Sequence, residues 1–127
     1  MILVDTSVWI RSARQRSPRE ALELDSLLAQ DEVAVTEIVI AEVLQGSRAP
    51  ADFDVLADKL DALHFLDATK ETWRRAGQLS FQLARQGLPT PLADLAIAAV
   101  ALEHDVALYA VDEHFQRVPG LRLHEIA

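Results

Sequence analysis

The chain alternates short apolar runs with longer stretches that are apolar on one face. The run at residues 2–4 predicts a buried strand at the N-terminus. Similar runs predict three further strands, at residues 33–36, 63–66 and 106–111, and residues 121–124 could add a short edge strand. Helical stretches separate the first four strands, which indicates parallel pairing through crossover connections.

Helices are predicted where a capping residue precedes apolar residues at helical spacing. Each predicted cap is a serine or a threonine: Ser17 for a helix starting at Pro18, Thr36 for residues 38–44, Thr69 for a helix ending near Gly87, and Thr90 for residues 92–104. The last of these helices is apolar nearly all round, which places it in the interior. The chain is therefore expected to be a single α/β domain over residues 1–127, a three-layer α/β/α sandwich with a central, mainly parallel sheet of four to five strands.

Four acidic residues stand out because they follow predicted strands or lie in apolar helices. Asp5 and Asp112 follow the first and the last clear strand, where open parallel sheets place their ligand sites. Glu42 interrupts an apolar run, and Asp94 lies in the first turn of the most apolar helix, where an isolated carboxylate is costly. Each also has an ordinary explanation, as a helix cap, a rim residue, a partner of the helix dipole or the start of a turn.

Taken together, the four acids predict a site for a hard metal ion. Mg²⁺ and Mn²⁺ prefer carboxylate and water oxygens as ligands, and a divalent cation relieves the mutual repulsion of clustered carboxylates. Such a cation can polarise a phosphoryl oxygen and activate water. The pattern points to metal-assisted phosphodiester hydrolysis, provided that the fold brings the four acids together.

The overall charge argues against a general nucleic-acid coat, with one local exception. The formal net charge is −8, whereas proteins that coat nucleic acids are basic. However, residues 6–19 contain no acid and four arginines, here called the basic segment: Arg11, Arg14, Arg16 and Arg19. These arginines could contact phosphates or an acidic protein partner, or they could form an ordinary solvated surface.

The absence of cysteine narrows the chemistry. A chain with no cysteine has no disulfides, zinc–thiolate sites or cysteine nucleophiles. It is compatible with a reducing cytoplasm, which is the predicted location. The apolar stretch at residues 95–102 is too short to span a bilayer, and the first residues lack the basic region of a secretory signal.

Two rival families with an acid near the first strand are excluded by individual positions. A haloacid-dehalogenase-like phosphatase needs a second Asp two residues after the first, where this chain has Ser7. A response-regulator receiver needs a lysine after a late strand, and the two lysines here are Lys59 and Lys70. A non-catalytic α/β domain that binds a protein partner remains open.

Four pieces of the sequence together resemble the PIN-domain ribonucleases, and most closely the VapC toxins of bacterial toxin–antitoxin pairs. Each piece alone is weak, but the ordered set is specific and covers essentially the whole chain. The pieces are residues 2–9 (ILVDTSVW), 40–46 (IAEVLQG), 92–99 (LADLAIAA) and 112–120 (DEHFQRVPG).

The resemblance implies a catalytic site in which Asp5, Glu42, Asp94 and Asp112 hold Mg²⁺ or Mn²⁺. It implies that the hydroxyl of Thr6 orients a neighbouring carboxylate in support of Asp5. The implied substrate is RNA that is accessible as a single strand, cut to leave a 5′-phosphate and a 3′-hydroxyl. The resemblance also implies a homodimer and a cognate VapB-like antitoxin that blocks the acidic groove, often with a basic side chain.

The chain departs from the family pattern just before its last acid. Many relatives carry Thr, Ser or Asn in the two preceding positions, where this chain has Ala110 and Val111. The first three acids are therefore expected to be direct ligands, and Asp112 to hold a second metal or only a bridging water. His114 is a conceivable proton carrier, but it is expected to be a surface residue, because a metal-activated water needs no histidine base.

Overall fold

The chain folds around a sheet of four short parallel strands. In the computed structural model, which describes residues 1–13 and 18–126, the strands are β1 (Ile2–Val4), β2 (Val33–Val35), β3 (His64–Phe65) and β4 (Ala107–Tyr109). Their spatial order is β3-β2-β1-β4, and every neighbouring pair is parallel. The predicted parallel α/β architecture is confirmed, with strands shorter than the apolar runs that predicted them.

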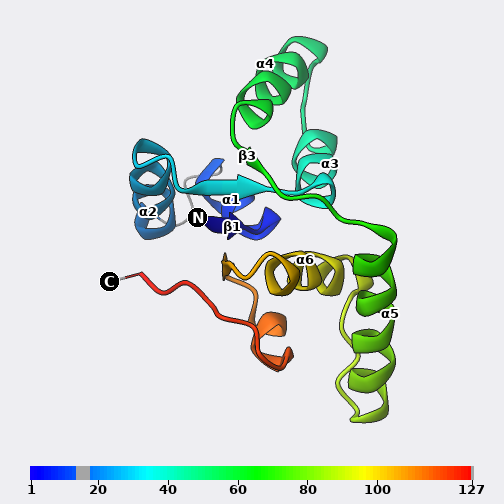
Figure 1. Ribbon diagram of the computed structural model, residues 1–127. Coiled ribbons are helices and arrows are strands. Elements are labelled where there is room, and N and C mark those ends of the chain that lie inside the picture. Colours follow the sequence, from blue (N-terminus) through cyan, green and yellow to red (C-terminus); the bar gives the residue numbers. More distant parts are fainter. Residues whose placement is uncertain (14–17, 127) are drawn as a thin grey trace.

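Helices connect the strands and flank the sheet (Figure 1). Within the described residues they are α1 (Thr6–Ala13), α2 (Pro18–Ala29), α3 (Glu37–Gln45), α4 (Pro50–Asp61), α5 (Lys70–Arg85), α6 (Leu92–Glu103) and the 3-10 helix η1 (Glu113–Arg117). Every connection between sheet neighbours contains at least one helix, as parallel pairing requires.

Side chains alternate between the two faces of the sheet, and this alternation builds the layers. On one face the strands contribute Leu3, Ala34 and Leu108 to a core shared with α3, α5 and α6. On the other face they contribute Val4, Val33 and Tyr109 to a core shared with α1 and α2. Two helical layers thus enclose one sheet, which confirms the predicted three-layer α/β/α sandwich.

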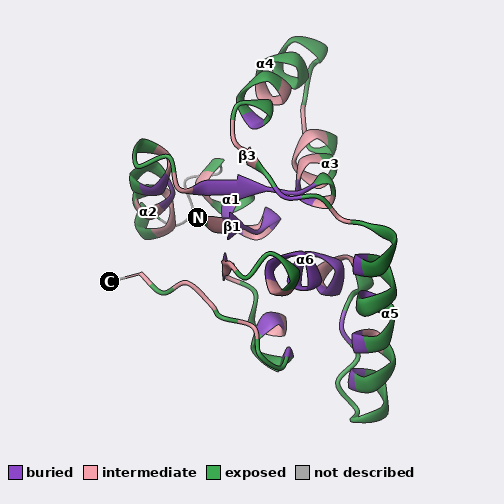
Figure 2. Ribbon diagram, in the orientation of Figure 1, coloured by how far each residue is buried: buried purple, intermediate pink, exposed green. Residues whose placement is uncertain are grey.

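Helix α6 forms the centre of the larger core, as its apolar composition predicted. All residues from 95 to 101 are buried, and Figure 2 shows this helix almost entirely in the colour of buried residues. Helix α6 packs most extensively against α5, whose outer face is exposed. Asp94 therefore enters the site from a rigid element, because the rest of its helix is held on all sides.

The helices begin near the predicted capping residues, but not every one of these residues makes a capping hydrogen bond. Thr69 is confirmed as a cap, because its hydroxyl accepts from the main-chain N–H of Thr72. Thr36 and Thr90 stand at or just before helix starts, yet each donates its hydroxyl instead, to a neighbouring side chain and to a main-chain carbonyl. Ser17 lies outside the described residues.

Two parts of the chain differ from the sequence-based expectation. Helix α4 was not predicted, and its apolar stripe is weak, since it has a single buried residue, Leu60. The edge strand expected at residues 121–124 is reduced to one bridge between Leu123 and Leu108. The sheet therefore has four strands, the lower end of the predicted range.

A search of the described residues for membrane-crossing segments finds no helix with the necessary length and apolar character.

Candidate metal centre

The turns after β1 and β4 meet at one edge of the sheet. Parallel neighbours end at the same edge, and two hydrogen bonds join the turns that follow them. The Asp5 main-chain N–H donates to the Tyr109 carbonyl oxygen at 2.8 Å, and that of Val111 donates to Ser7 Oγ at 3.3 Å. The first candidate acid therefore lies beside the segment that leads to the last one.

Asp5 serves both as a helix cap and as a buried acid. Its Oδ2 accepts from the main-chain N–H of Ser7 at 3.1 Å and from Ser7 Oγ at 2.5 Å, at the start of α1. The residue is only 4% exposed. Burial raises the pKa of Asp5 to about 6, against the lowering effect of the two Ser7 bonds. The cap explanation and the site explanation are therefore compatible.

Thr6 supports Glu42 rather than Asp5. The Thr6 hydroxyl donates to Glu42 Oε1 at 2.8 Å, across 36 residues of sequence. This bond connects the first turn of α1 to α3 and orients the Glu42 carboxylate. The Thr6 hydroxyl thus orients a carboxylate as expected, but this carboxylate is Glu42, and the side chain that holds Asp5 is Ser7 from the same turn.

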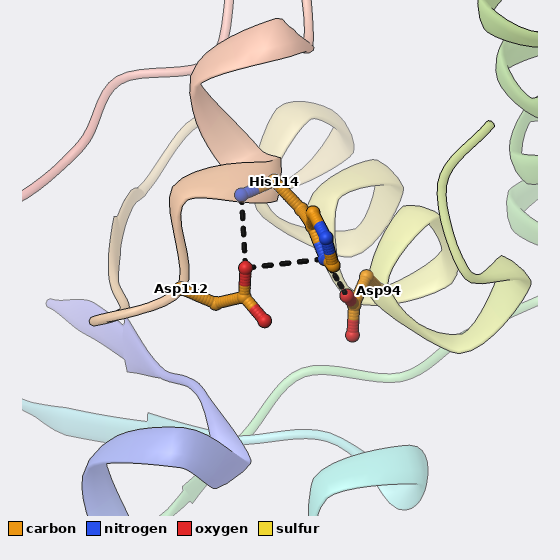
Figure 3. Close-up of side chains that lie close together, drawn as sticks. All are labelled: Asp94, Asp112 and His114. Carbon is orange, nitrogen blue, oxygen red and sulfur yellow. Dashed lines mark hydrogen bonds and ion pairs between the residues drawn. The ribbon is translucent and has the colours of Figure 1, made fainter. Parts of the chain in front are cut away.

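Asp94, Asp112 and His114 form a compact group of possible ligands (Figure 3). One donor atom from each lies within 4.8 Å of the other two. His114 Nδ1 is 3.3 Å from Asp94 Oδ2 and 3.1 Å from Asp112 Oδ1. The Asp112 carboxylate also caps η1, because it accepts from the His114 main-chain N–H at 2.9 Å.

Mutual repulsion links the four acids electrostatically. The pKa of Asp94 is raised, mainly by burial and further by the charges of Asp112 and Glu42. The charge of Asp94 in turn adds to the rise in the pKa of Asp5. Asp5, Glu42 and Asp112 are thus each within electrostatic reach of Asp94. We call this group the four-acid centre.

A groove lies beside the four-acid centre at Glu42, the one acid of the centre that lines it. The groove has a volume of about 670 Å³ and is lined by side chains of α1, α3 and α4 and of the α3–α4 connection. Its lining includes Trp9, Glu42, Arg48 and Asp52. A polymer or a partner chain that entered this groove would meet Glu42 on α3.

The basic segment is only partly described. Arg14 and Arg16 lie outside the described residues. Arg11 is exposed in the last turn of α1, and Arg19 donates to the Ile126 carbonyl oxygen at 3.5 Å. Arg19 thus contacts the C-terminal segment of the chain, whereas Arg11 points to solvent near the end of the groove-lining helix.

Two polar residues of the centre were not recognised from the sequence. Ser7 holds Asp5 through two hydrogen bonds. Its position two residues after a capping acid is the sequence feature that could have indicated this contact. His114 was expected at the surface, but it is half-buried and contacts both Asp94 and Asp112. The sequence feature that could have indicated these contacts is again the spacing, because His114 stands two residues after Asp112.

The donor set fits a divalent cation. Asp5 and Asp94, whose pKa values are raised, carry an electrostatic cost that a cation would offset. Oxygen donors in this number suit Mg²⁺ and Mn²⁺. Asp94 and Asp112 belong to one group of possible ligands and are the first candidates to hold the ion, with Asp5 and Glu42 in electrostatic reach of Asp94.

Comparison with known proteins agrees with this geometry. A model of the PIN domain family matches residues 2–121. Ribonuclease VapC18 of Mycobacterium tuberculosis is 34% identical, over 93% of this chain and 87% of that protein. Ribonuclease VapC5 of the same organism is 31% identical, over 98% of this chain and 92% of that protein.

A solved structure shows the same fold. VapBC2 from Rickettsia felis, in a crystal structure with a DNA fragment from its promoter, contains a chain that superposes with a TM-score of 0.78. The two chains are 25% identical, and the match covers 98% of each. With the family model, the VapC relatives and the fold in agreement, the chain belongs to the PIN-domain family and, within it, to the VapC ribonucleases.

Proposed function

We propose that this chain is the toxin of a type II toxin–antitoxin pair and that it hydrolyses RNA phosphodiesters at the four-acid centre with Mg²⁺ or Mn²⁺. The observation that carries the proposal is that Asp94 and Asp112 lie in one group of possible metal ligands, with Asp5 and Glu42 in electrostatic reach of Asp94. Residues 1–127 act as one domain in this proposal, since both ends of the chain contribute to the same sheet region.

Each residue of the centre has a task in this mechanism. The four carboxylates would hold the cation, while Ser7 and Thr6 fix the orientation of Asp5 and Glu42. The cation supplies Lewis acidity to a phosphoryl oxygen and a lower pKa to an attacking water. The pKa of Asp5 is raised in the chain without the ion, so a bound cation would favour the ionised form of this side chain. In-line attack would leave a 5′-phosphate and a 3′-hydroxyl.

The alternative of a non-catalytic binding domain is less well supported. A domain that only binds a protein has no need for buried acids that repel one another, because each costs stability in the folded state. The relatives named as ribonucleases cover nearly the whole chain.

A cleavage assay tests the proposed function directly. The chain is purified free of antitoxin and incubated with total cellular RNA in Mn²⁺, in Mg²⁺ and in excess chelator. Discrete RNA fragments with 5′-phosphate ends are expected with either metal and not with chelator. If RNA stays intact at every metal concentration, or if chelator leaves cleavage unchanged, the proposal is overturned.

The expected partners follow from two surfaces. We propose that a VapB-like antitoxin occupies the groove beside Glu42 and places a basic side chain near the acids, where their negative potential favours it.

We propose a homodimer through the exposed face of α5, which carries Trp73 and Phe81, 44% and 63% exposed. Sedimentation of the antitoxin-free chain, and of a Phe81→Asp variant, distinguishes dimer from monomer.

Replacing Thr6 with Val is expected to lower the RNA cleavage rate by about 10- to 100-fold, the usual cost of losing a side chain that orients a metal ligand. Val keeps the shape of Thr but removes the hydrogen bond to Glu42. Steady-state cleavage of a fluorescent RNA over a range of Mn²⁺ concentrations measures the effect.

Thr72→Val is the matched control for this prediction. Thr72 also donates its hydroxyl to a glutamate, Glu103 Oε2 at 2.9 Å, but Glu103 is the last residue of α6, whereas Asp94 lies in its first turn. That variant should lose thermal stability and keep its cleavage rate. Equal rate losses in the two variants would show that the Thr6 bond acts on the fold and not on the centre.

A further inference from the structure

His114 occupies an unusual place between two acids of the centre. Its Nδ1 is 3.1 Å from Asp112 Oδ1 and 3.3 Å from Asp94 Oδ2. The ring is aimed by its own main chain, because the His114 N–H donates to the same Asp112 oxygen and fixes the start of η1. Figure 3 shows the ring between the two carboxylates. The imidazole is thus presented to the centre by a local cap.

The distances match those between neighbouring ligands of one ion. In an octahedral site with bonds of about 2.1 Å, adjacent ligand atoms lie about 3.0 Å apart. The two separations from Nδ1 are close to that value, and the three donor atoms all lie within 4.8 Å. The tautomer with its proton on Nε2 leaves a lone pair on Nδ1 for a metal.

We propose that His114 Nδ1 is a direct ligand of the cation held by Asp94 and Asp112, and that this nitrogen makes the centre select Mn²⁺ over Mg²⁺. The inference rests on the proposed metal-dependent function. Mg²⁺ takes an all-oxygen environment, whereas imidazole nitrogen suits transition metals. A mixed site of two carboxylates and one imidazole therefore gains more from Mn²⁺ than from Mg²⁺.

The same distances also fit a hydrogen-bonding role. In that arrangement Nδ1 carries the proton and donates to both carboxylates, and the cation contacts oxygen alone. His114 would then be a positioning residue with little influence on the choice of metal. The two roles differ in one measurable respect, which is whether a nitrogen nucleus is bonded to the bound Mn²⁺.

Pulsed electron paramagnetic resonance of the Mn²⁺-loaded chain detects whether a nitrogen nucleus is bonded to the Mn²⁺. Electron spin-echo modulation from a directly coordinated ¹⁴N is expected in the wild type. It is expected to change to the ¹⁵N pattern when the protein is labelled with ¹⁵N-histidine, and to vanish in His114→Gln. The labelled wild type needs no variant, so the test holds even where a substitution disturbs folding.

His64→Gln is the matched control. The His64 side chain is 38% exposed against 37% for His114, and its Nε2 also lies beside an aspartate, Asp31 Oδ1 at 3.2 Å. Its ring is on β3, whose main contacts are with β2, and it does not belong to the group of three possible ligands. The modulation should therefore survive this substitution unchanged.

Metal affinities give the second readout. Calorimetric titration of His114→Gln should show Mn²⁺ binding weakened by about tenfold or more, the scale of losing one group from a metal site, and Mg²⁺ binding weakened by less than about threefold. The inference is overturned if Mn²⁺ binds without nitrogen modulation, or if both affinities fall equally. A wild type that binds no Mn²⁺ would overturn the proposed function as well.

Discussion

Replacing Asp94 with Asn is expected to reduce RNA cleavage by at least about a thousandfold, because a metal site that loses a central carboxylate loses most of its stabilisation of the transition state. Asp94 comes from the rigid start of α6 and faces Asp112 and His114. Asn keeps the size of the side chain and removes its charge. Single-turnover cleavage of a fixed RNA with Mn²⁺ measures the loss.

The fold should survive this change. The pKa of Asp94 is raised in the folded protein, so its charge is destabilising there, and the neutral amide relieves that cost. The melting temperature in chelator should stay equal or rise. A drop in both activity and melting temperature would instead assign Asp94 a structural role.

Asp105→Asn is the matched control for Asp94→Asn. Asp105 has a φ of 53°, a conformation that Asn tolerates well, and its side chain is 94% exposed in a pair with Arg122. This variant should cleave RNA at the wild-type rate. A comparable loss in the control would mean that the change of charge acts at a distance and not through the centre.

Replacing Asp5 with Asn is expected to stabilise the metal-free chain in a pH-dependent way. The pKa of Asp5 is raised from 3.8 to about 6 in the folded state. The contribution of Asp5 to stability is therefore fully present below about pH 4 and is lost as the pH rises through about 6. Above that range the ionised side chain costs on the order of 3 kcal/mol relative to a neutral one.

Urea unfolding in chelator between pH 4 and pH 8 checks this sign. The free energy of unfolding of Asp5→Asn, compared with the wild type, should rise across the range and level off above pH 6. Mn²⁺ at pH 7.5 should then stabilise the wild type more than the variant, because only the wild type keeps the charge that the cation relieves. If the difference in the free energy of unfolding between the variant and the wild type does not change with pH, the charge of Asp5 does not destabilise the folded chain.

Local patterns were sufficient for most of the helices and strands. The apolar run before Asp5 and the all-round apolar helix around Asp94 identified β1 and α6, because burial on every side leaves a continuous apolar sequence. Helix α4 escaped prediction for the opposite reason. Leu60 is its one buried residue and Leu56 packs half-buried against the core, so most of the helix surface faces solvent and its apolar stripe is narrow.

The polar contacts of the centre could not be predicted in the same way. The Thr6–Glu42 bond spans 36 residues, and its partner depends on how α1 and α3 pack. His114 was expected at the surface because an isolated histidine after an acid is ordinary, whereas its actual neighbour Asp94 lies 20 residues away. The contact of Arg19 with Ile126 likewise joins the two ends of the chain.

The sequence by itself determined the type and order of the elements, the parallel α/β class and the four candidate acids, since these follow from periodicity and from the cost of burying a charge. Only the tertiary structure decided which carboxylate each hydroxyl holds and that His114 joins Asp94 and Asp112. The physical reason is the distance along the chain over which each effect acts. Periodicity and capping act within a few residues, whereas distances across the centre depend on the packing of helices onto both faces of the sheet.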